Sequence, residues 1–164
     1  MKCWLAASVL VAFASATLPA RADCNQFKWS VSRELAWLSA NPAPIPDDGR
    51  VPSFEKGYLV TLAKLDAKKF EIQPDRAPAA NSYTAVLKLP AVEKAGLFQI
   101  TLSDEAWIDV IQNGKSVRSS DFSGQKDCPG VRKTVRFPLE KGEATIQLRN
   151  SQKTSLKLAV RPAE

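Results

Sequence analysis

The amino-acid sequence predicts a mainly β protein: an antiparallel β-sandwich or jelly roll with one N-terminal α-helix. Short stretches in which apolar and polar residues alternate recur between residues 57 and 160, as expected for strands with one buried face. Polar turns separate these stretches at regular spacing, and one stretch of helical spacing precedes them. Short, evenly spaced strands of this kind are typical of sandwiches and jelly rolls.

The first residues have the pattern of an export signal. Lys2 is followed by an apolar run over residues 3–18, and Ala20-Arg21-Ala22 matches an A-x-A cleavage site. We therefore expect a signal peptide over residues 1–22 and a periplasmic or secreted mature chain that begins at Asp23. The apolar run is short for a membrane span, so the mature protein is expected to be soluble, with no membrane span after cleavage. Cleavage lowers the formal charge from +6 to about +4.

Two cysteines remain in the mature chain, Cys24 and Cys128. An even pair in an exported protein predicts one disulfide, because the compartment is oxidising. The alternative is a redox or metal-binding pair, but neither cysteine belongs to a C-x-x-C motif. The residues before Cys24 lack the apolar and small residues of a lipoprotein signal. We expect the disulfide to tie the N-terminus to the loop before a strand that includes Thr134.

Apolar residues recur at helical spacing near the start of the mature chain: Phe27, Val31, Leu35 and Leu38. They predict one amphipathic helix over residues 26–39, with Ser30, Arg33 and Glu34 on the opposite side. Two tryptophans are predicted to be packing anchors rather than a ligand platform: Trp29 and Trp37. The next segment, residues 41–52, contains four prolines and is predicted to be an extended connection.

Eight strands are predicted, over residues 58–62, 69–73, 83–89, 97–102, 107–111, 133–137, 144–148 and 155–160. Residues 103–106 are predicted to be a hairpin connection, and Asn113-Gly114 to form a type I′ turn. Residues 115–133 are predicted to be a loop. The expected domain organisation is a signal peptide (1–22), a helix with a proline-rich connection (23–56) and one sandwich domain (57–164).

Part of the second half of the chain resembles a known family. The pattern over residues 96–114, and the step Phe137-Pro138-Leu139-Glu140-Lys141-Gly142 before a strand, look like the bacterial pre-peptidase C-terminal domain. That family is a small β-sandwich appended to secreted enzymes. The resemblance covers roughly the last half of the chain and implies a sandwich fold, and its motifs are those of turns more than of a site.

The whole chain is also similar to a group of small exported proteins of proteobacteria without a characterised function. The residues that carry this resemblance are Cys24, Phe27 to Trp29, Val31 to Glu34, Ser120 to Gln125 and Cys128. Some members of that group carry the name homogentisate dioxygenase. A non-haem iron oxygenase normally needs histidine ligands, and this chain contains no histidine, so the name implies no mechanism here.

The absence of histidine also excludes the commonest general base and the Ser-His-Asp and Cys-His arrangements. Neither a phosphate-binding glycine-rich loop nor a dinucleotide fingerprint is present, so we expect no cofactor and no metal. Asp104, Glu105 and Asp109 are the only carboxylates considered for glycosidase-like catalysis. Because Asp104 and Glu105 fall in a predicted turn, where acidic residues are ordinary, we expect no catalytic site.

The first candidate binding residues are Trp107 and Asp109. With Ile108 and Val110 facing the core, they share the other face of the sheet, where a tryptophan can stack on a sugar or anchor a partner protein. The alternative, which we favour from the sequence, is that the helix carrying Trp37 covers this face.

A second candidate is the basic loop 115–133 with Arg118 and Phe122, because binding residues are often found on loops. The sequence therefore predicts a non-catalytic binding or interaction module with an envelope protein as partner. The alternative is a carbohydrate-binding sandwich that uses Trp107 on an envelope polysaccharide, and a carboxylate-dependent enzyme comes third. Nucleic acid is not expected as a partner, because the basic residues are scattered.

Overall fold

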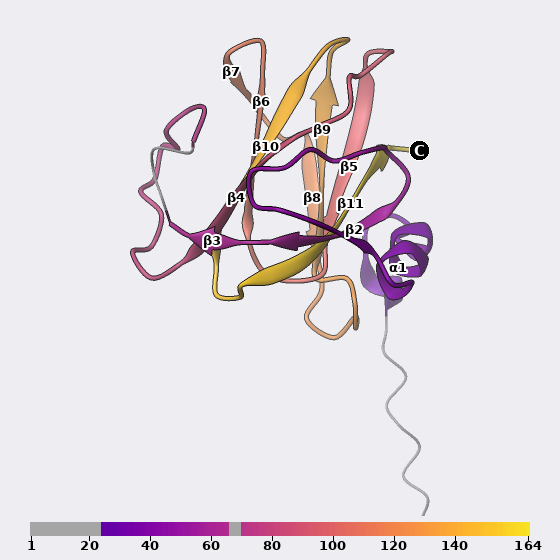
Figure 1. Cartoon of the computed structure of the whole chain (residues 1–164). Coiled ribbons are helices and arrows are strands. Elements are labelled where there is room, and N and C mark those ends of the chain that lie inside the picture. The colour runs from indigo at the N-terminus through magenta and orange to yellow at the C-terminus, as the bar shows by residue number, and fades with distance from the viewer. Residues whose placement is uncertain (1–23, 66–69) are drawn as a thin grey trace, which may run out of the picture.

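The computed structural model describes residues 24–65 and 70–164, and in it two β-sheets pack face to face (Figure 1). This arrangement confirms the predicted β-sandwich with one N-terminal α-helix. The predicted signal peptide, residues 1–22, lies outside the described residues. None of the helices in the described residues is long and apolar enough to cross a membrane.

The first sheet, sheet A, contains six strands. In spatial order they are β1 (Ala43–Ile45), β2 (Gly57–Thr61), β11 (Ser155–Pro162), β5 (Gly96–Leu102), β9 (Lys133–Leu139) and β8 (Asp121–Gly124). All neighbours pair antiparallel except β1 and β2, which are parallel. The edge strand β1 lies inside the proline-rich connection, as expected for an extended segment whose prolines exclude it from the centre of a sheet.

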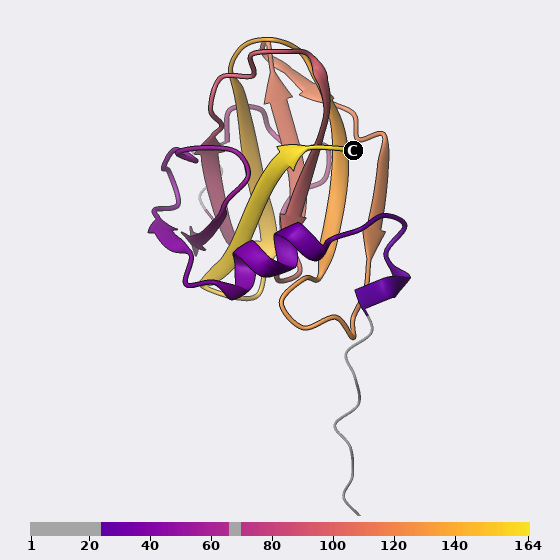
Figure 2. The same ribbon diagram turned by 90° about the vertical axis from the view of Figure 1, so that its right-hand side faces the viewer.

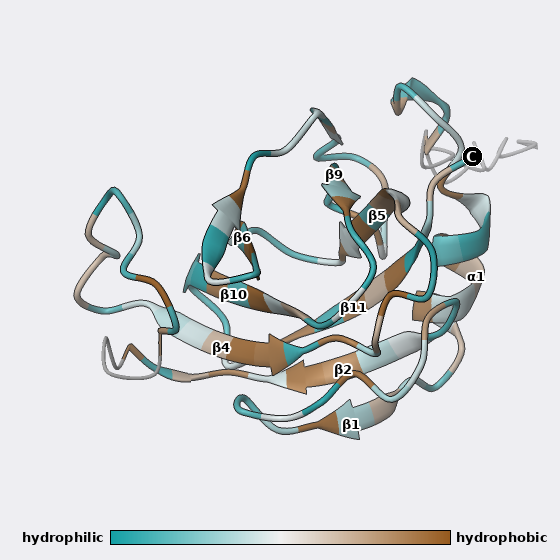
Figure 3. Cartoon of the chain, turned by 90° about the horizontal axis from the view of Figure 1, so that it is seen from above, coloured by the Kyte–Doolittle hydropathy of each residue, from teal (hydrophilic) through white to brown (hydrophobic). Residues whose placement is uncertain are grey.

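The second sheet, sheet B, contains five antiparallel strands. In spatial order they are β3 (Ala63–Lys64), β4 (Tyr83–Lys88), β10 (Ala144–Ser151), β6 (Trp107–Gln112) and β7 (Lys115–Val117). Alternate residues of both sheets fill the space between them, with Val60 and Ile100 from sheet A and Ile146 from sheet B fully buried. Hydrophobic stretches of β2 and β4 are seen in brown in Figure 3.

The predicted hairpin at residues 103–106 is wrong. Strand β5 pairs with β9 and β11 in sheet A, whereas β6 pairs with β7 and β10 in sheet B. Residues 103–106 therefore carry the chain from one sheet to the other. An alternating pattern indicates that one face of a strand is buried. Two consecutive strands can both bury one face either as neighbours in one sheet or as members of the two opposite sheets.

The Asn113-Gly114 turn is confirmed. Both residues have positive φ, 52° and 67°, as a type I′ turn between β6 and β7 requires. The prediction that residues 115–133 form only a loop is wrong, because β7 and β8 lie within it. These strands have three and four residues and little apolar alternation, so the sequence pattern did not reveal them.

The predicted strand over residues 69–73 is also wrong for its described residues, 70–73. They belong to a loop that runs over the outer face of sheet B, and its main chain is bound by a side chain rather than by a neighbouring strand. Phe70 is buried there, so its side chain helps to attach the loop to the sheet and is not part of a strand. Lys69 lies outside the described residues.

The N-terminal segment contains a 3₁₀ turn, η1 (Cys24–Gln26), and an eight-residue helix, α1 (Ser32–Ser39). The predicted helix start at residue 26 is wrong, because residues 24–26 form the 3₁₀ turn and α1 begins only at Ser32. Between them the main-chain N–H of Lys28 donates to Ser123 Oγ on β8. The predicted disulfide between Cys24 and Cys128 is present and fastens this segment to the loop before β9.

Helix α1 lies on the outer face of sheet A, against β2 and β11 (Figure 2). Its backbone comes so close that a Cβ added to Gly57 would lie 2.6 Å from the carbonyl oxygen of Trp37. The prediction that Glu34 faces solvent is wrong. Glu34 is fully buried against the sheet, where Arg161 Nε donates to its Oε1 over 2.6 Å and Gln99 donates to the same atom.

The two predicted packing anchors do lie against the small apolar cluster between α1 and sheet A. Trp29 and Trp37 are both partly buried there. The guanidinium of Arg136 stacks over the Trp29 ring, 4.0 Å from its centroid. Sheet A is thus covered on both faces, by sheet B and by the N-terminal segment.

Candidate functional site

The outer face of sheet B carries an exposed aromatic side chain next to polar and charged side chains. The prediction that the helix covers Trp107 is wrong, because α1 lies on sheet A. Trp107 is 53% exposed and is one of the two exposed large hydrophobic residues in the described part of the chain. It stands on β6 with Asp109 and Ile111, the residues of that strand whose side chains point away from the core.

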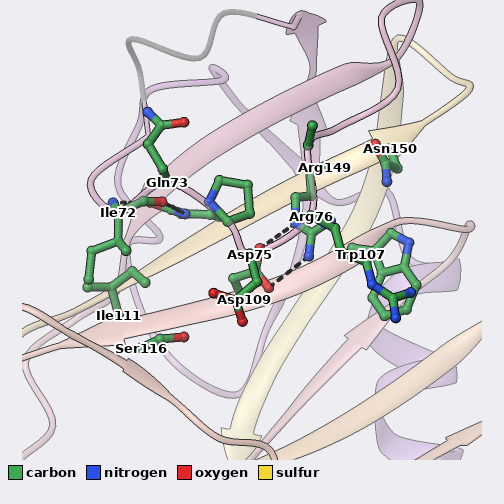
Figure 4. A pocket seen from close by; sticks show the side chains of 13 residues that line it. Ile72, Gln73, Asp75, Arg76, Trp107, Asp109, Ile111, Ser116, Arg149 and Asn150 are labelled. Carbon is green, nitrogen blue, oxygen red and sulfur yellow. Dashed lines mark hydrogen bonds and ion pairs between the residues drawn. The ribbon is translucent and has the colours of Figure 1, made fainter.

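A pocket of about 520 Å³ opens on this face beside Trp107. Residues of β6, β7 and β10 form its floor, and residues 72–77 form a wall (Figure 4). Figure 4 shows Asp109 between Trp107 and Ile111 along β6. The lining mixes an aromatic ring, aliphatic side chains, amides and charges, which is the composition of a site for a polar ligand.

The floor of the pocket contains an ion pair between neighbouring strands. Arg149 on β10 donates from Nε to Asp109 Oδ2 over 2.5 Å and from a terminal nitrogen to Oδ1 over 3.3 Å. The Arg149 side chain is 9% exposed and that of Asp109 is 23% exposed. Such a planar, two-point pair is held more rigidly than a pair of free surface charges. It presents hydrogen-bond acceptors and donors side by side.

Two cations flank the Trp107 ring. The guanidinium of Arg149, which is directly opposite Trp107 in the β6–β10 register, lies 5.4 Å from the ring centroid. The Lys133 Nζ of β9 lies 5.5 Å from it and donates to the carbonyl of Ala106 over 3.0 Å. Both are within the range of cation–π attraction, so they orient the ring while leaving about half of the residue exposed.

Gln147 holds the wall of the pocket in place. This side chain on β10 is 1% exposed, and its Oε1 accepts hydrogen bonds from the main-chain N–H groups of Glu71, over 2.7 Å, and Ile72, over 3.1 Å. Its Nε2 donates to the carbonyl of Ile72 over 2.9 Å. Sequence reasoning missed this residue, because a glutamine at an outward strand position usually faces solvent.

Asn150 marks a β-bulge at the end of the floor. Its φ is +60°, and the register of β10 against β4 shifts between Leu148 and Ser151. Bulges redirect side chains and are frequent beside binding sites. Here the Asn150 Oδ1 accepts a hydrogen bond from the N–H of Ala79 over 2.8 Å, which fastens the far end of the loop.

The other two predicted binding residues lie elsewhere. Phe122 is on β8, the edge strand of sheet A, and is 66% exposed, with Lys28 Nζ 5.6 Å from its ring centroid. Arg118 is exposed between β7 and β8. The structure thus brings Trp107 and Asp109 together in one pocket that does not include Phe122 or Arg118.

The carboxylate beside Phe122 is electrostatically stabilised. Asp121 Oδ1 accepts hydrogen bonds from Lys28 Nζ over 2.6 Å and from the N–H of Phe122 over 2.7 Å. The Lys28 hydrogen bond, and next the Phe122 N–H, hold the pKa of Asp121 below its ordinary value of 3.8.

Each carboxylate considered for catalysis is engaged by a cation. Asp104 pairs with Lys153, Glu105 with Arg132 and Lys133, and Asp109 with Arg149. These pairs suit ligand binding or stability better than proton transfer. The described residues contain no group of three or more histidine, cysteine, aspartate or glutamate side chains placed to hold a metal ion.

No protein-family model matches this chain, and the searches of curated proteins and of solved structures found no match either. The resemblances noted from the sequence therefore stay predictions, and the function is argued from the pocket alone.

Proposed function

We propose that this protein is an exported, non-catalytic binding module whose pocket on sheet B takes a carbohydrate. The observation that carries the proposal is the exposed Trp107 at the rim of a pocket of about 520 Å³. An aromatic ring gives the apolar face of a sugar a flat surface, and the polar groups beside it bind hydroxyls.

The Asp109–Arg149 pair supports a polyhydroxylated ligand in particular. A carboxylate accepts hydrogen bonds and a guanidinium donates them, so the pair matches neighbouring hydroxyl groups that do both. Because two hydrogen bonds hold the pair in a fixed geometry, little ordering is needed on binding. The charges that line the pocket, Asp75, Arg76, Asp109 and Arg149, balance formally, which suits an uncharged sugar unit.

Export to the periplasm or beyond is part of the proposal. The predicted signal peptide and the Cys24–Cys128 disulfide both fit an oxidising compartment, where envelope polysaccharide is accessible.

The test compares two variants of the mature chain with the disulfide intact. Trp107→Ala is expected to weaken retention on envelope polysaccharide by about tenfold or more, as hot-spot aromatics do. Phe122→Ala is the matched control, because it removes the other exposed aromatic residue from a different sheet. Equal retention by wild type and Trp107→Ala, with unchanged circular dichroism, would overturn the assignment.

A second candidate is protein interaction through β8. This strand ends sheet A, carries Phe122 and, among the described residues, has a strand neighbour on one edge only. Such edges bind an added strand of a partner. Under this alternative, Phe122→Ala and not Trp107→Ala loses a protein from a pull-down with periplasmic extract.

A further inference from the structure

A second pocket, of about 430 Å³, lies beside the proposed sugar site. Asn150 lines both pockets. The chain also links them directly, since Glu105 lines the second pocket and Trp107 lines the first, with only the buried Ala106 between them. Trp107 and Asn150 therefore stand at the boundary of two adjoining pockets.

The local backbone explains why Asn150 reaches both pockets. The bulge in β10 places Asn150 out of the alternation followed by Gln147 and Arg149, where the pairing with β4 is interrupted between Leu148 and Ser151. Its Oδ1 is occupied by the N–H of Ala79, so the side chain is fixed rather than free to close either pocket.

The two pockets differ in charge. The second is lined by two acidic residues and three basic ones: Asp104, Glu105, Lys126, Arg132 and Lys153. Lys153 pairs with Asp104 and Arg132 with Glu105, whereas no described carboxylate pairs with Lys126, which is exposed. The described lining of the second pocket therefore carries one net positive charge, on Lys126, and that of the first is formally neutral.

We propose that the ligand is an acidic oligosaccharide that spans both pockets, with one sugar unit on Trp107 and an anionic group beside Lys126. The inference rests on the proposed function, because it extends the same site. An ammonium group attracts a uronate carboxylate and a phosphate alike, so the shared requirement is a negative charge one or more units along the chain from the stacked sugar. A single sugar unit on Trp107 leaves the second pocket without a ligand group.

The experiment measures affinity by isothermal titration calorimetry with the mature, oxidised chain. The probes are a galacturonate hexamer, a neutral cellohexaose of the same length, monomeric galacturonate and a glycerol-phosphate hexamer. Lys126→Gln is compared with Lys94→Gln, which removes one exposed positive charge outside both pockets. This control is needed because the net positive charge of the chain attracts any polyanion.

The acidic hexamer is expected to bind about fivefold more tightly than the neutral one, as for one partly exposed charge pair. Lys126→Gln removes that preference, Lys94→Gln keeps it, and monomeric galacturonate binds more weakly than the hexamer. A glycerol-phosphate hexamer has no sugar ring to stack on Trp107, so tighter binding of this probe than of the galacturonate hexamer overturns the assignment to an oligosaccharide. Equal affinity for the acidic and neutral hexamers, or the same preference in both lysine variants, overturns the inference.

The two proposals fail in different ways. If cellohexaose binds and Trp107→Ala abolishes its binding, the sugar site stands even where the acidic preference is absent. If the galacturonate hexamer binds equally well to wild type and Trp107→Ala, the stacking site itself is wrong.

Discussion

Glu34 is a carboxylate buried in the interior, and its burial depends on a distant cation. It is fully buried under α1, and its charge is balanced by Arg161, whose side chain is 3% exposed. Among the described residues, its Oε2 has no hydrogen-bond partner. Burying a carboxylate is costly unless a cation and hydrogen-bond donors replace water, so Glu34 and Arg161 depend on each other.

Glu34→Ala is expected to lower the free energy of unfolding by about 3–5 kcal/mol, because the buried Arg161 charge then has only the distant, exposed carboxylate of Glu164, 3.9 Å away. Urea unfolding followed by tryptophan fluorescence measures this loss. Arg33→Ala is the matched control, since Arg33 pairs with Glu164 on the surface and both side chains are more than half exposed. A loss in Glu34→Ala no larger than in the control would contradict this account.

The same residue shows what the sequence could not predict. Helical spacing placed Glu34 on the polar side, because a carboxylate is rarely found facing a core. Its partner Arg161 is 127 residues away, so nothing local indicates that the charge is balanced. The prediction that Trp107 is covered is wrong for a similar reason. Its exposure depends on which sheet the helix covers, and no local pattern indicates that.

Asp121 makes the stability dependent on pH. Its pKa in the folded state is lowered from 3.8, so its contribution to stability is fully present above that value and is lost as the pH falls through the folded pKa. Asp121→Asn is therefore expected to unfold at lower urea than wild type at about pH 6, with the difference vanishing as the pH falls below 3.8. Urea midpoints measured across the acidic range test this. A difference that persists at the acid end would show a role for Asp121 other than its charge.

At the scale of elements, the disulfide holds the N-terminal segment that covers sheet A. It links residues 104 positions apart, and closing a loop of that length stabilises a fold by about 4–5 kcal/mol in the chain-entropy description. The double variant Cys24→Ala/Cys128→Ala is expected to lose most of this amount in urea unfolding. Wild type under reducing conditions should match the double variant. If the oxidised wild type also matches it, the bond contributes nothing to stability.

Elements with strong local signals were predicted well, including the strands at Leu97 and Trp107 and the Asn113-Gly114 turn. The pairing of these strands was not predicted, because β5 and β6 belong to different sheets. An alternating pattern does not indicate which other strand a given strand pairs with. The alternating pattern over residues 69–73 predicts a strand where the structure has the loop that leads into the pocket wall, residues 72–77. Its attachment depends on Gln147, which is far along the chain.

At the scale of the whole molecule, the sandwich depends on residues before its main strands. Ile45 and Val51 belong to the main core, and β1 extends sheet A. A chain that begins at Gly57 would also lose α1 and expose Arg161 without Glu34. We expect this fragment, which corresponds to the predicted sandwich domain, to lack cooperative urea unfolding and native near-ultraviolet circular dichroism. A cooperative transition would show that residues 57–164 fold independently.

The way in which Gln147 binds the pocket wall has a consequence for how this scaffold can diversify. The glutamine hydrogen-bonds only to main-chain atoms of Glu71 and Ile72, so this part of the attachment does not depend on the side chains of those two residues. The exposed positions Asp75 and Arg76 can therefore change while Gln147 still holds the loop. A library randomised at these two positions would vary ligand preference on a constant framework, as interchangeable loops do in antibodies.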